Sequence, residues 1–446
     1  MCEEATVFDS SMVRHESRAL MNQRTGSHLL RSTFFCFLGV MVLLPHPFAV
    51  GNASEDVYFG LLAARRSKKR LLIIAPIQLP GFLRLPLLDF SIIDVQSEFL
   101  ICRPLNRWLL PLRWIVTIYF GFWRALSEVR QVRFGLDGFP DIKILPNAGQ
   151  DRFFTPTYRP STFSWTDVTS LSWESQFASP IGVSLPRKTV LEGRKALRGM
   201  GVPDDSWFVC VHVREAGFWR DDLALRNADI MNYIPMFKEI VSAGGHVVRM
   251  GDATMTPLRR EPNVHDYALT SLRSAAVDAY LLKNCRYFIG MQSGLLDTAM
   301  LYDRPRLITN AYSPFDGNAF RVNDRAIYRT FVDSQGKLID AVDLLIDWDE
   351  EVEFIYPFPD VGISMRENTQ EELVKAHNQF TLALSQGFPE EANDPREHRF
   401  QSKSRLLIAE YGLRMTPEET CAMRFRRAAQ LTSGLTSRMY NVQPQR

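Results

Sequence analysis

The chain has 446 residues, of which 46% are hydrophobic and 23% are charged, and its formal net charge is +2. This length exceeds one ordinary hydrophobic core, so we expect two globular domains. The near-neutral charge argues against nucleic acid as the main partner, because no overall field attracts a polyanion. The six cysteines are scattered without a C-x-x-C pair, which argues against a disulfide scaffold or a zinc site and favours a cytoplasmic protein.

The first residues, 1–35, show no periodicity and predict a poorly ordered extension. An apolar run at 34–44 follows and is stopped by Pro45. It is too short to span a bilayer, and it favours a first buried strand around 39–44 over a signal peptide.

A helix is predicted next. Gly51 and Asn52 favour a turn, and Asn52 or Ser54 can cap a helix whose first turn holds Glu55, a favourable charge for the helix dipole. The apolar residues 71–75 then predict a strand. The pattern indicates a β-α-β unit that opens the amino-terminal domain.

Residues 108–123 are apolar and aromatic, and arginines surround them. Pro111 and Arg113 interrupt the run, which argues against a transmembrane span. A core helix of the amino-terminal domain is the favoured interpretation. The alternative is peripheral membrane contact, with aromatic rings among the lipid headgroups and arginines facing anionic lipid.

A segment at 150–187 that is rich in Ser, Thr and Pro predicts irregular structure and a linker, followed by a helix at 190–198. From residue 208 onward, strands alternate regularly with helices, which predicts a parallel sheet with right-handed crossovers. The predicted strands are Phe208–Val213, His246–Met250, Tyr287–Met291 and Arg306–Thr309, the last of the series; the helices between them are Ala228–Ser242, 273–283 and one that begins near Ser293.

Past residue 340, the sequence Thr369-Gln370-Glu371-Glu372 matches a capping box and predicts a helix through Phe380. We therefore divide the chain into an extension (1–35), an amino-terminal domain (36–187), a carboxyl-terminal α/β domain (188–345) and a helical tail (346–446).

Polar residues follow the ends of the predicted strands, where ligands bind in open parallel sheets. Arg214 comes directly after the first strand and can clamp a phosphate, or it can be a structural partner of Glu215 or Asp252. Ser293 and Gly294 begin a helix, where free N–H groups attract anions and glycine lets a ligand approach, although a plain serine cap is common. Together, these positions describe a diphosphate site.

Several carboxylates remain open to more than one interpretation. Asp278 interrupts an apolar helix and either faces solvent or reads a donor-rich base edge. Five residues border a nucleotide or serve as turn residues; they are Arg249, Gly251 and Asp252 at a strand end, and Asp266 and Tyr267 in the following connection. The loop carboxylates are candidates for a general base towards an acceptor hydroxyl; they are Glu215, Asp221 and Asp222.

The chain resembles a bacterial family of glycosyltransferases of surface polysaccharide clusters, which is related to the protein O-, core and nodulation fucosyltransferases. The resemblance covers roughly residues 40–385, and its order and spacing make it specific. The segments that carry it are VHVRE (211–215), RNADIMNYIP (226–235), GGHVVRMGD (244–252), HDYA (265–268), VDAYLL (277–282), FIGMQSGLLDTAML (288–301), GNASEDVYFGLLAARRSKKRLLI (51–73) and ENTQEELVKAHNQF (367–380).

This resemblance implies a GT-B fold, in which two Rossmann-like domains face a cleft and the second holds a nucleotide-sugar donor. It implies that Arg214 binds the β-phosphate, that Asp278 reads guanine and that Ser293 binds phosphate. Asp222 falls where the core enzymes have an assigned base. The full set expected around the donor is His212, Arg214, Gly251, Asp252, Asp266, Asp278, Ser293 and Gly294, with Gly51, Asn52 and Glu55 forming an acceptor or diphosphate loop.

We therefore expect a cytoplasmic, inverting glycosyltransferase without metal or cofactor, using a GDP-fucose-like donor and a glycan or lipid-linked acceptor. A fixed Arg and helix-start N–H groups can stabilise the diphosphate leaving group. The first alternative is a sugar-nucleotide-binding regulator or scaffold without transfer activity. A second is a related transferase of another group, such as pyruvyl.

Overall fold

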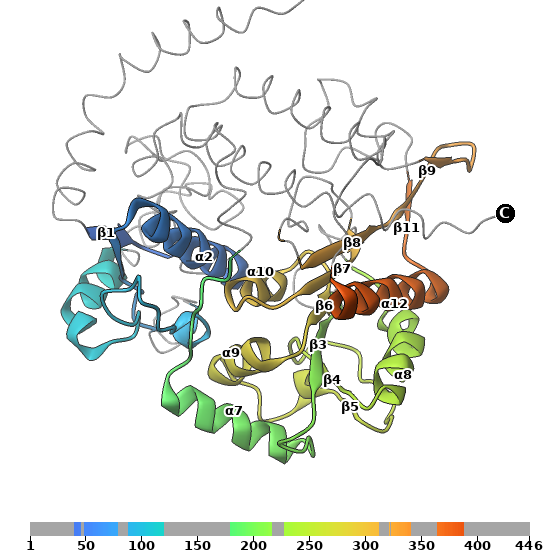
Figure 1. Ribbon diagram of the computed structural model, residues 1–446, viewed down its shortest axis with the longest axis horizontal. Coiled ribbons are helices and arrows are strands. Elements are labelled where there is room, and N and C mark those ends of the chain that lie inside the picture. The colour runs from blue at the N-terminus through green and yellow to red at the C-terminus, as the bar shows by residue number, and fades with distance from the viewer. Residues whose placement is uncertain are drawn as a thin grey trace, which may run out of the picture.

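The computed structural model describes residues 40–45, 49–78, 88–119, 179–215, 227–311, 321, 323–339 and 364–387 (Figure 1). Its main elements in chain order are β1 (Val40–Leu43), α2 (Val50–Ser67), β2 (Arg70–Ile73), the 3-10 helices η2 (Phe90–Ile93) and η3 (Arg107–Leu109), α7 (Arg187–Gly199), β3 (Phe208–His212), η6 (Ile230–Tyr233), α8 (Ile234–Ser242), β4 (His246–Arg249), β5 (Val264–His265), η7 (Tyr267–Leu269), α9 (Ala275–Asn284), β6 (Phe288–Gly290), α10 (Gly294–Leu301), β7 (Arg306–Ala311), β8 (Asp324–Tyr328), β9 (Thr330–Val332), β10 (Leu338–Ile339), β11 (Ser364–Arg366) and α12 (Gln370–Gln386).

The central sheet has six parallel strands in the order β5-β4-β3-β6-β7-β8. The predicted α/β class with a parallel sheet in the carboxyl-terminal half is confirmed. The prediction that the series ends at Thr309 is wrong, because β8 pairs with β7. The sequence of β8, DRAIY, looks too charged for a buried strand, but Asp324 lies in ion pairs with Arg306 and Arg321.

The sheet is covered on both faces (Figure 1). Side chains alternate along β3, so that Phe208 and Cys210 join the core shared with α2, α7, α9 and α10, whereas Val209 and Val211 face α8 and α12. Cys210 is a free thiol, as expected of a buried reduced cysteine. Burial on both faces explains why these strands are continuous apolar runs.

The amino-terminal β-α-β unit is confirmed, since β1 pairs parallel with β2 and α2 connects them. The predicted start of the helix is wrong. The helix begins at Val50, with Ala49 as an N-cap that makes no side-chain hydrogen bond, so Gly51 and Asn52 lie inside the first turn. Ser54 does not cap the helix, because its hydroxyl is hydrogen-bonded to that of Thr298, at 2.8 Å.

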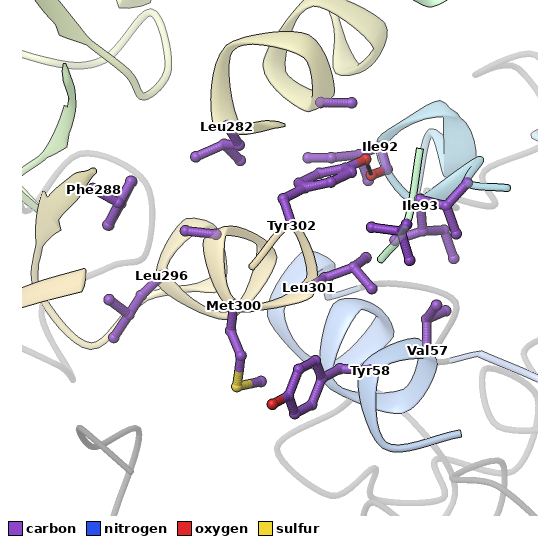
Figure 2. Close-up of a cluster of buried hydrophobic side chains, with 14 of the residues drawn as sticks. Val57, Tyr58, Ile92, Ile93, Leu282, Phe288, Leu296, Met300, Leu301 and Tyr302 are labelled. Atoms are coloured by element: carbon purple, nitrogen blue, oxygen red, sulfur yellow. Dashed lines mark hydrogen bonds between the residues drawn. The ribbon is translucent and has the colours of Figure 1, made fainter. Parts of the chain in front are cut away.

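That contact belongs to a core that joins the amino-terminal unit to the large sheet. In Figure 2, Tyr58 of α2 lies beside Met300 of α10, and Tyr302 lies beside Ile92 of η2. The Tyr302 hydroxyl donates to the carbonyl of Ile92 at 2.7 Å. These contacts fix α2 against α10. The domain boundaries stay predictions, and residues 1–39 and 388–446 lie outside the described part of the chain.

Residues 110–119 are helical after η3. The favoured prediction of a core helix here is wrong for residues 108–119, because most of the large apolar side chains are exposed, with Trp108 at 76% and Ile118 at 65%. Leu109, Val116 and Thr117 face inward. Residues 120–123 lie outside the described residues, and no described helix is long and apolar enough to cross a membrane.

The predicted capping box is confirmed at α12. The Thr369 hydroxyl accepts from the Glu372 N–H, while the Glu372 carboxylate accepts from the Thr369 N–H. Downstream of the cap, the buried His377 ring nitrogen is hydrogen-bonded to the Tyr287 hydroxyl at 2.8 Å. These contacts fasten α12 to the sheet.

Candidate functional site

The carboxyl ends of β4, β3 and β6 lie side by side, so the polar residues that follow them share one edge. The Cα partners are Val211 with Arg249 and His212 with Gly290. Arg214 lies two residues past the end of β3, and Gln292 lies two residues past the end of β6. Ser293 follows Gln292. The register therefore brings Arg214 to the start of α10, as expected of a shared anion site.

Close approach of β3 and β6 requires glycine at residue 290. A Cβ there would stand 2.7 Å from the carbonyl oxygen of His212. Beyond the strand, the half-buried Arg214 accepts through its backbone carbonyl from the N–H of Ala228 at 3.0 Å. This bond holds the backbone of Arg214 against the segment that leads to α8.

A fully buried arginine, Arg249, ties the loops of this edge together. Its guanidinium is ion-paired with Glu215 and, at 3.2 Å, with Asp266, and it donates to the carbonyl of Thr256 at 2.6 Å. Glu215 also accepts from the Thr256 N–H at 2.7 Å, and Asp266 from the Leu258 N–H at 3.0 Å. Glu215 and Asp266 therefore serve as structural partners here, and both oxygens of Glu215 are occupied.

His212 lies between β3 and β4, with its Nδ1 3.2 Å from the carbonyl oxygen of Met250. A carbonyl can only accept, so Nδ1 carries the proton and Nε2 presents a lone pair. Burial lowers the pKa of His212 to about 4, and the nearby Arg214 and Arg249 charges act in the same direction. At neutral pH the ring is a neutral acceptor, suited to a hydroxyl group.

The end of β4 is shaped by Gly251 and Asp252. Gly251 has φ +149°, and a Cβ there would stand 2.1 Å from the Met255 sulfur. Asp252 accepts from the N–H of Thr254 at 2.8 Å, so it forms the turn. Arg273 donates to the Gly251 carbonyl at 3.3 Å, which brings a second guanidinium to this edge.

Asp278, in the first turn of α9, is held by Tyr267. The Tyr267 hydroxyl donates to the carboxylate at 2.8 Å and accepts from the Ser274 N–H at 3.1 Å. Burial raises the pKa of Asp278 to about 7, although the Tyr267 bond and Arg273 oppose the rise. The alternative of a carboxylate freely facing solvent is thereby wrong.

Ser293 occupies the N-cap position of α10, but its side chain makes no capping hydrogen bond. Its hydroxyl oxygen is buried without a hydrogen-bond partner among the residues that the structure describes. A serine at this position normally accepts from an N–H of the first turn. An orphaned buried hydroxyl beside the N–H groups of a helix start describes a place for an anion.

The starts of α2 and α10 meet at two glycines. A Cβ on Gly294 would stand 2.4 Å from Val50 Cγ1 and 2.8 Å from the Gly51 nitrogen. One turn further along, Ser54 meets Thr298, so the helices run in the same direction with their positive ends together. A Cβ on Gly51 would stand 2.6 Å from the Asp297 carboxylate, which offsets part of this charge.

The structure places Arg214 and Ser293 after neighbouring strands at one edge of the sheet. Gly51 lies at the junction with Ser293 and Gly294, although within a helix and not in a loop. Asn52 and the partly buried Glu55 are in the same helix. The candidate bases Asp221 and Asp222 lie outside the described residues. No group of three metal-ligating side chains occurs among the residues that are described.

Sequence reasoning assigned no role to Arg273 or Asp297, and it gave Arg249 and Tyr267 only as residues that border a nucleotide or form a turn. Arg249 interrupts the apolar strand sequence HVVRM, and a charge in a buried strand was a signal that a partner existed. The contact of Asp297 with α2 crosses more than 240 residues of chain, and no local pattern reports it.

No family model and no curated protein matches the chain. Solved structures similar to it include the E. coli ADP-heptose LPS heptosyltransferase II (14% identity, TM-score 0.37, covering 77% of this chain and 99% of that one). A glycosyl transferase family 9 protein from Veillonella parvula DSM 2008 is similar at 10% identity and TM-score 0.42, covering 76% and 97%. The NodZ α-1,6-fucosyltransferase soaked with GDP-fucose is similar at 15% identity and TM-score 0.27, covering 59% and 93%. Likeness of this degree does not decide what the chain binds, which depends on the residues of the site.

Proposed function

We propose that the chain is a GT-B glycosyltransferase that moves a sugar from a nucleotide-diphosphate donor to a glycan or lipid-linked acceptor. The observation that carries the proposal is the buried, unpartnered hydroxyl of Ser293 at the start of α10. Arg214 follows the neighbouring strand at nearly the same level of the sheet. A hydroxyl donor, helix-start N–H groups and a guanidinium together match a diphosphate.

In the proposed reaction, the bond between the sugar carbon and the diphosphate oxygen breaks, and its electron pair goes to the diphosphate. Arg214, Ser293 and the first N–H groups of α10 stabilise that charge. An acceptor hydroxyl attacks the sugar carbon from the opposite face, which inverts the configuration, and a carboxylate takes its proton. Asp222 and Asp221 are the candidates for this base, since the Glu215 carboxylate is engaged with Arg249 and Thr256.

The donor is proposed to be GDP-fucose-like, with the base near Asp278. An ionised carboxylate accepts from the two adjacent N–H groups on the guanine edge. Tyr267 fixes the orientation of Asp278, and Arg273 reaches the neighbouring strand end at Gly251. The neutral ring of His212 is assigned to a hydroxyl of the donor.

We also propose that the reaction needs no metal, because Arg214 and the helix start can neutralise the leaving group. The sequence does contain one D-x-D, at Asp347-Trp348-Asp349, which lies outside the described residues. Turnover unchanged by a chelator, such as EDTA, supports the proposal; loss of turnover that Mg²⁺ or Mn²⁺ restores contradicts it.

The test of function begins with a thermal-shift panel of GDP-, UDP-, ADP- and CMP-sugars. One nucleotide class should raise the melting temperature, because a ligand that binds only the folded state stabilises it. Arg214→Ala and Ser293→Ala should each weaken that donor by roughly 10- to 100-fold, the value of a hydrogen bond to a charged group.

Matched controls are Arg198→Ala, whose side chain pairs with Asp204 on the surface, and Ser242→Ala, at the exposed end of α8. Both should leave donor affinity unchanged. A donor that binds but is neither transferred nor hydrolysed with any acceptor would favour the alternative, a sugar-nucleotide-binding regulator. Unchanged affinity in Arg214→Ala and Ser293→Ala would contradict the site.

A further inference from the structure

The surface of residues 107–118 presents six large apolar side chains to solvent, which we call the apolar stripe. Their exposed fractions run from 41% to 76%, and two of them are tryptophans: Trp108, Leu110, Leu112, Trp114, Ile115 and Ile118. Single exposed apolar residues are ordinary, but so many within eleven positions mark an interaction surface.

Hydrogen bonds attach the segment that carries the apolar stripe to the rest of the protein. Arg113 donates from Nε to the carbonyl of Ala75 at 2.8 Å, and the Thr117 hydroxyl accepts from the N–H of Ile77 at 2.7 Å. Asn106 caps the first turn by accepting from the N–H of Trp108 at 3.1 Å. The inward side chains therefore hold the segment to the chain that follows β2, so the outward stripe is a fixed feature of the fold. Residues 88–119 lie at the side of the molecule near β1 and α2 (Figure 1).

The exposed charge within the stripe is positive. Of the described arginines of this segment, Arg103 is paired with Asp94 at 3.0 Å and Arg113 is turned inward, which leaves Arg107 at the stripe; the sequence holds no Asp or Glu between residues 99 and 127. The Arg107 guanidinium lies over the Trp108 ring, 5.2 Å from its centroid, and Arg107 is exposed. This pair places a positive charge directly beside an amphipathic ring.

We propose that the apolar stripe docks the protein on the surface of an anionic lipid bilayer. Tryptophan and arginine suit the headgroup level, and the isoleucines suit the acyl boundary beneath it. A second copy of the chain is a poor occupant. A two-fold dimer would place Arg107 of one copy against the same patch of the other, with no carboxylate in the segment to pair it.

The docking goes beyond the proposed function, because it needs neither donor nor transfer. One consequence does rest on the proposed function, namely that the acceptor is lipid-linked and is met at the membrane. Binding to vesicles is measured without donor or acceptor. Its failure would therefore leave the Ser293 and Arg214 proposal standing, and the failure of donor binding would leave the docking standing.

The experiment is cosedimentation of the full chain with vesicles of phosphatidylcholine alone and of phosphatidylcholine with phosphatidylglycerol. We expect stronger binding to the anionic vesicles, reduced by salt. Ile115→Asp and Ile118→Asp should each weaken that binding about tenfold or more, because a charge replaces an apolar group that enters the bilayer on docking. Leu191→Asp is the matched control: Leu191 is 58% exposed on α7, outside the stripe, and its substitution should leave binding unchanged.

Arg107→Ala and Trp108→Ala are a second pair of substitutions, which remove a side chain without introducing a charge. Arg107→Ala should weaken binding to the anionic vesicles and leave binding to phosphatidylcholine unchanged, and melting curves should match the unchanged protein. The proposal is overturned if the unchanged chain does not bind anionic vesicles, or if the stripe variants bind as well as Leu191→Asp. It is also overturned if the chain dimerises through the stripe, so that Ile115→Asp yields monomers, and the vesicles remain unbound.

Discussion

Two polar clusters at the same edge of the sheet differ in how their polar groups are paired. Around Arg249, two carboxylates and the carbonyl of Thr256 meet the terminal nitrogens of one buried guanidinium, and both carboxylates also accept backbone N–H groups; only its Nε is buried without a partner among the described residues. At the start of α10, the buried hydroxyl of Ser293 has no hydrogen-bond partner in the described part of the chain. The charges of the first cluster are paired within the protein, whereas the second retains a donor for something else.

The Arg249 cluster therefore belongs to the framework of the fold, whereas Ser293 belongs to the proposed binding site. Removing one member of a buried cluster whose charges are paired leaves its partners uncompensated, so the cost appears in stability. Removing a group that has no partner costs the fold little, so its loss appears in binding. The following predictions use this contrast, and they run from the largest expected change in stability to the smallest.

Arg249→Ala should lower the free energy of unfolding by about 3–5 kcal/mol, because Glu215 and Asp266 would lose the charge that compensates them. Chemical denaturation followed by circular dichroism measures this. The control is Arg198→Ala, whose exposed pair with Asp204 is expected to contribute less than about 1 kcal/mol. Equal effects of the two substitutions would remove the distinction between framework and surface.

Asp278→Asn should change how stability depends on pH. The folded pKa is raised from 3.8 to about 7, so the folded chain holds this proton more tightly than the unfolded chain. The stabilising contribution is full below pH 4 and is lost as pH rises towards 7, by up to roughly 4 kcal/mol. Asparagine has no such proton, so the decline attributable to this residue should disappear. Melting temperatures from pH 4 to pH 8 measure it, and identical pH profiles would contradict the assignment.

Gly294→Ala should cost about 1–3 kcal/mol, since the new methyl group would force α2 away from α10. It should also weaken donor binding, because the two helix starts would separate. Gly199→Ala is the control: its Cβ would meet only the end of the Leu272 side chain, at 3.3 Å. If both alanine variants are equally stable, the glycine contact is not needed for packing.

The strand and helix series of the carboxyl-terminal half could be predicted because apolar runs and capping signals are local. The start of α2 could not, because Ala49 caps it without a side-chain bond and Gly51 is needed for contact with Gly294. The strand β8 was missed because its Asp324 is paired with Arg306 of the neighbouring strand and with Arg321, three residues before it. Composition alone cannot tell an exposed apolar segment from a buried one, which is why residues 108–119 were expected in the core.

For the site, strand ends indicated Arg214 and Ser293, since parallel strands end at one edge, whereas Asp278 was singled out as a charge within an apolar helix. The pairings of the site's charged residues were not predictable. The contact of Tyr267 with Asp278 and that of Glu215 with Arg249 depend on how loops fold back. The sequence likewise gave no means of knowing that Ser293 would lack a partner. That observation required the positions of all the neighbouring groups.

Ser293→Ala tests the central claim most directly, with stability and donor affinity measured on the same sample. The free energy of unfolding should change by less than about 0.5 kcal/mol, because the hydroxyl has no partner to lose. Affinity for the nucleotide-diphosphate donor identified by the thermal-shift panel should fall by roughly 10- to 100-fold. The opposite result, a loss of stability near 1 kcal/mol with donor affinity unchanged, would show Ser293 to be an ordinary helix cap and would contradict the account.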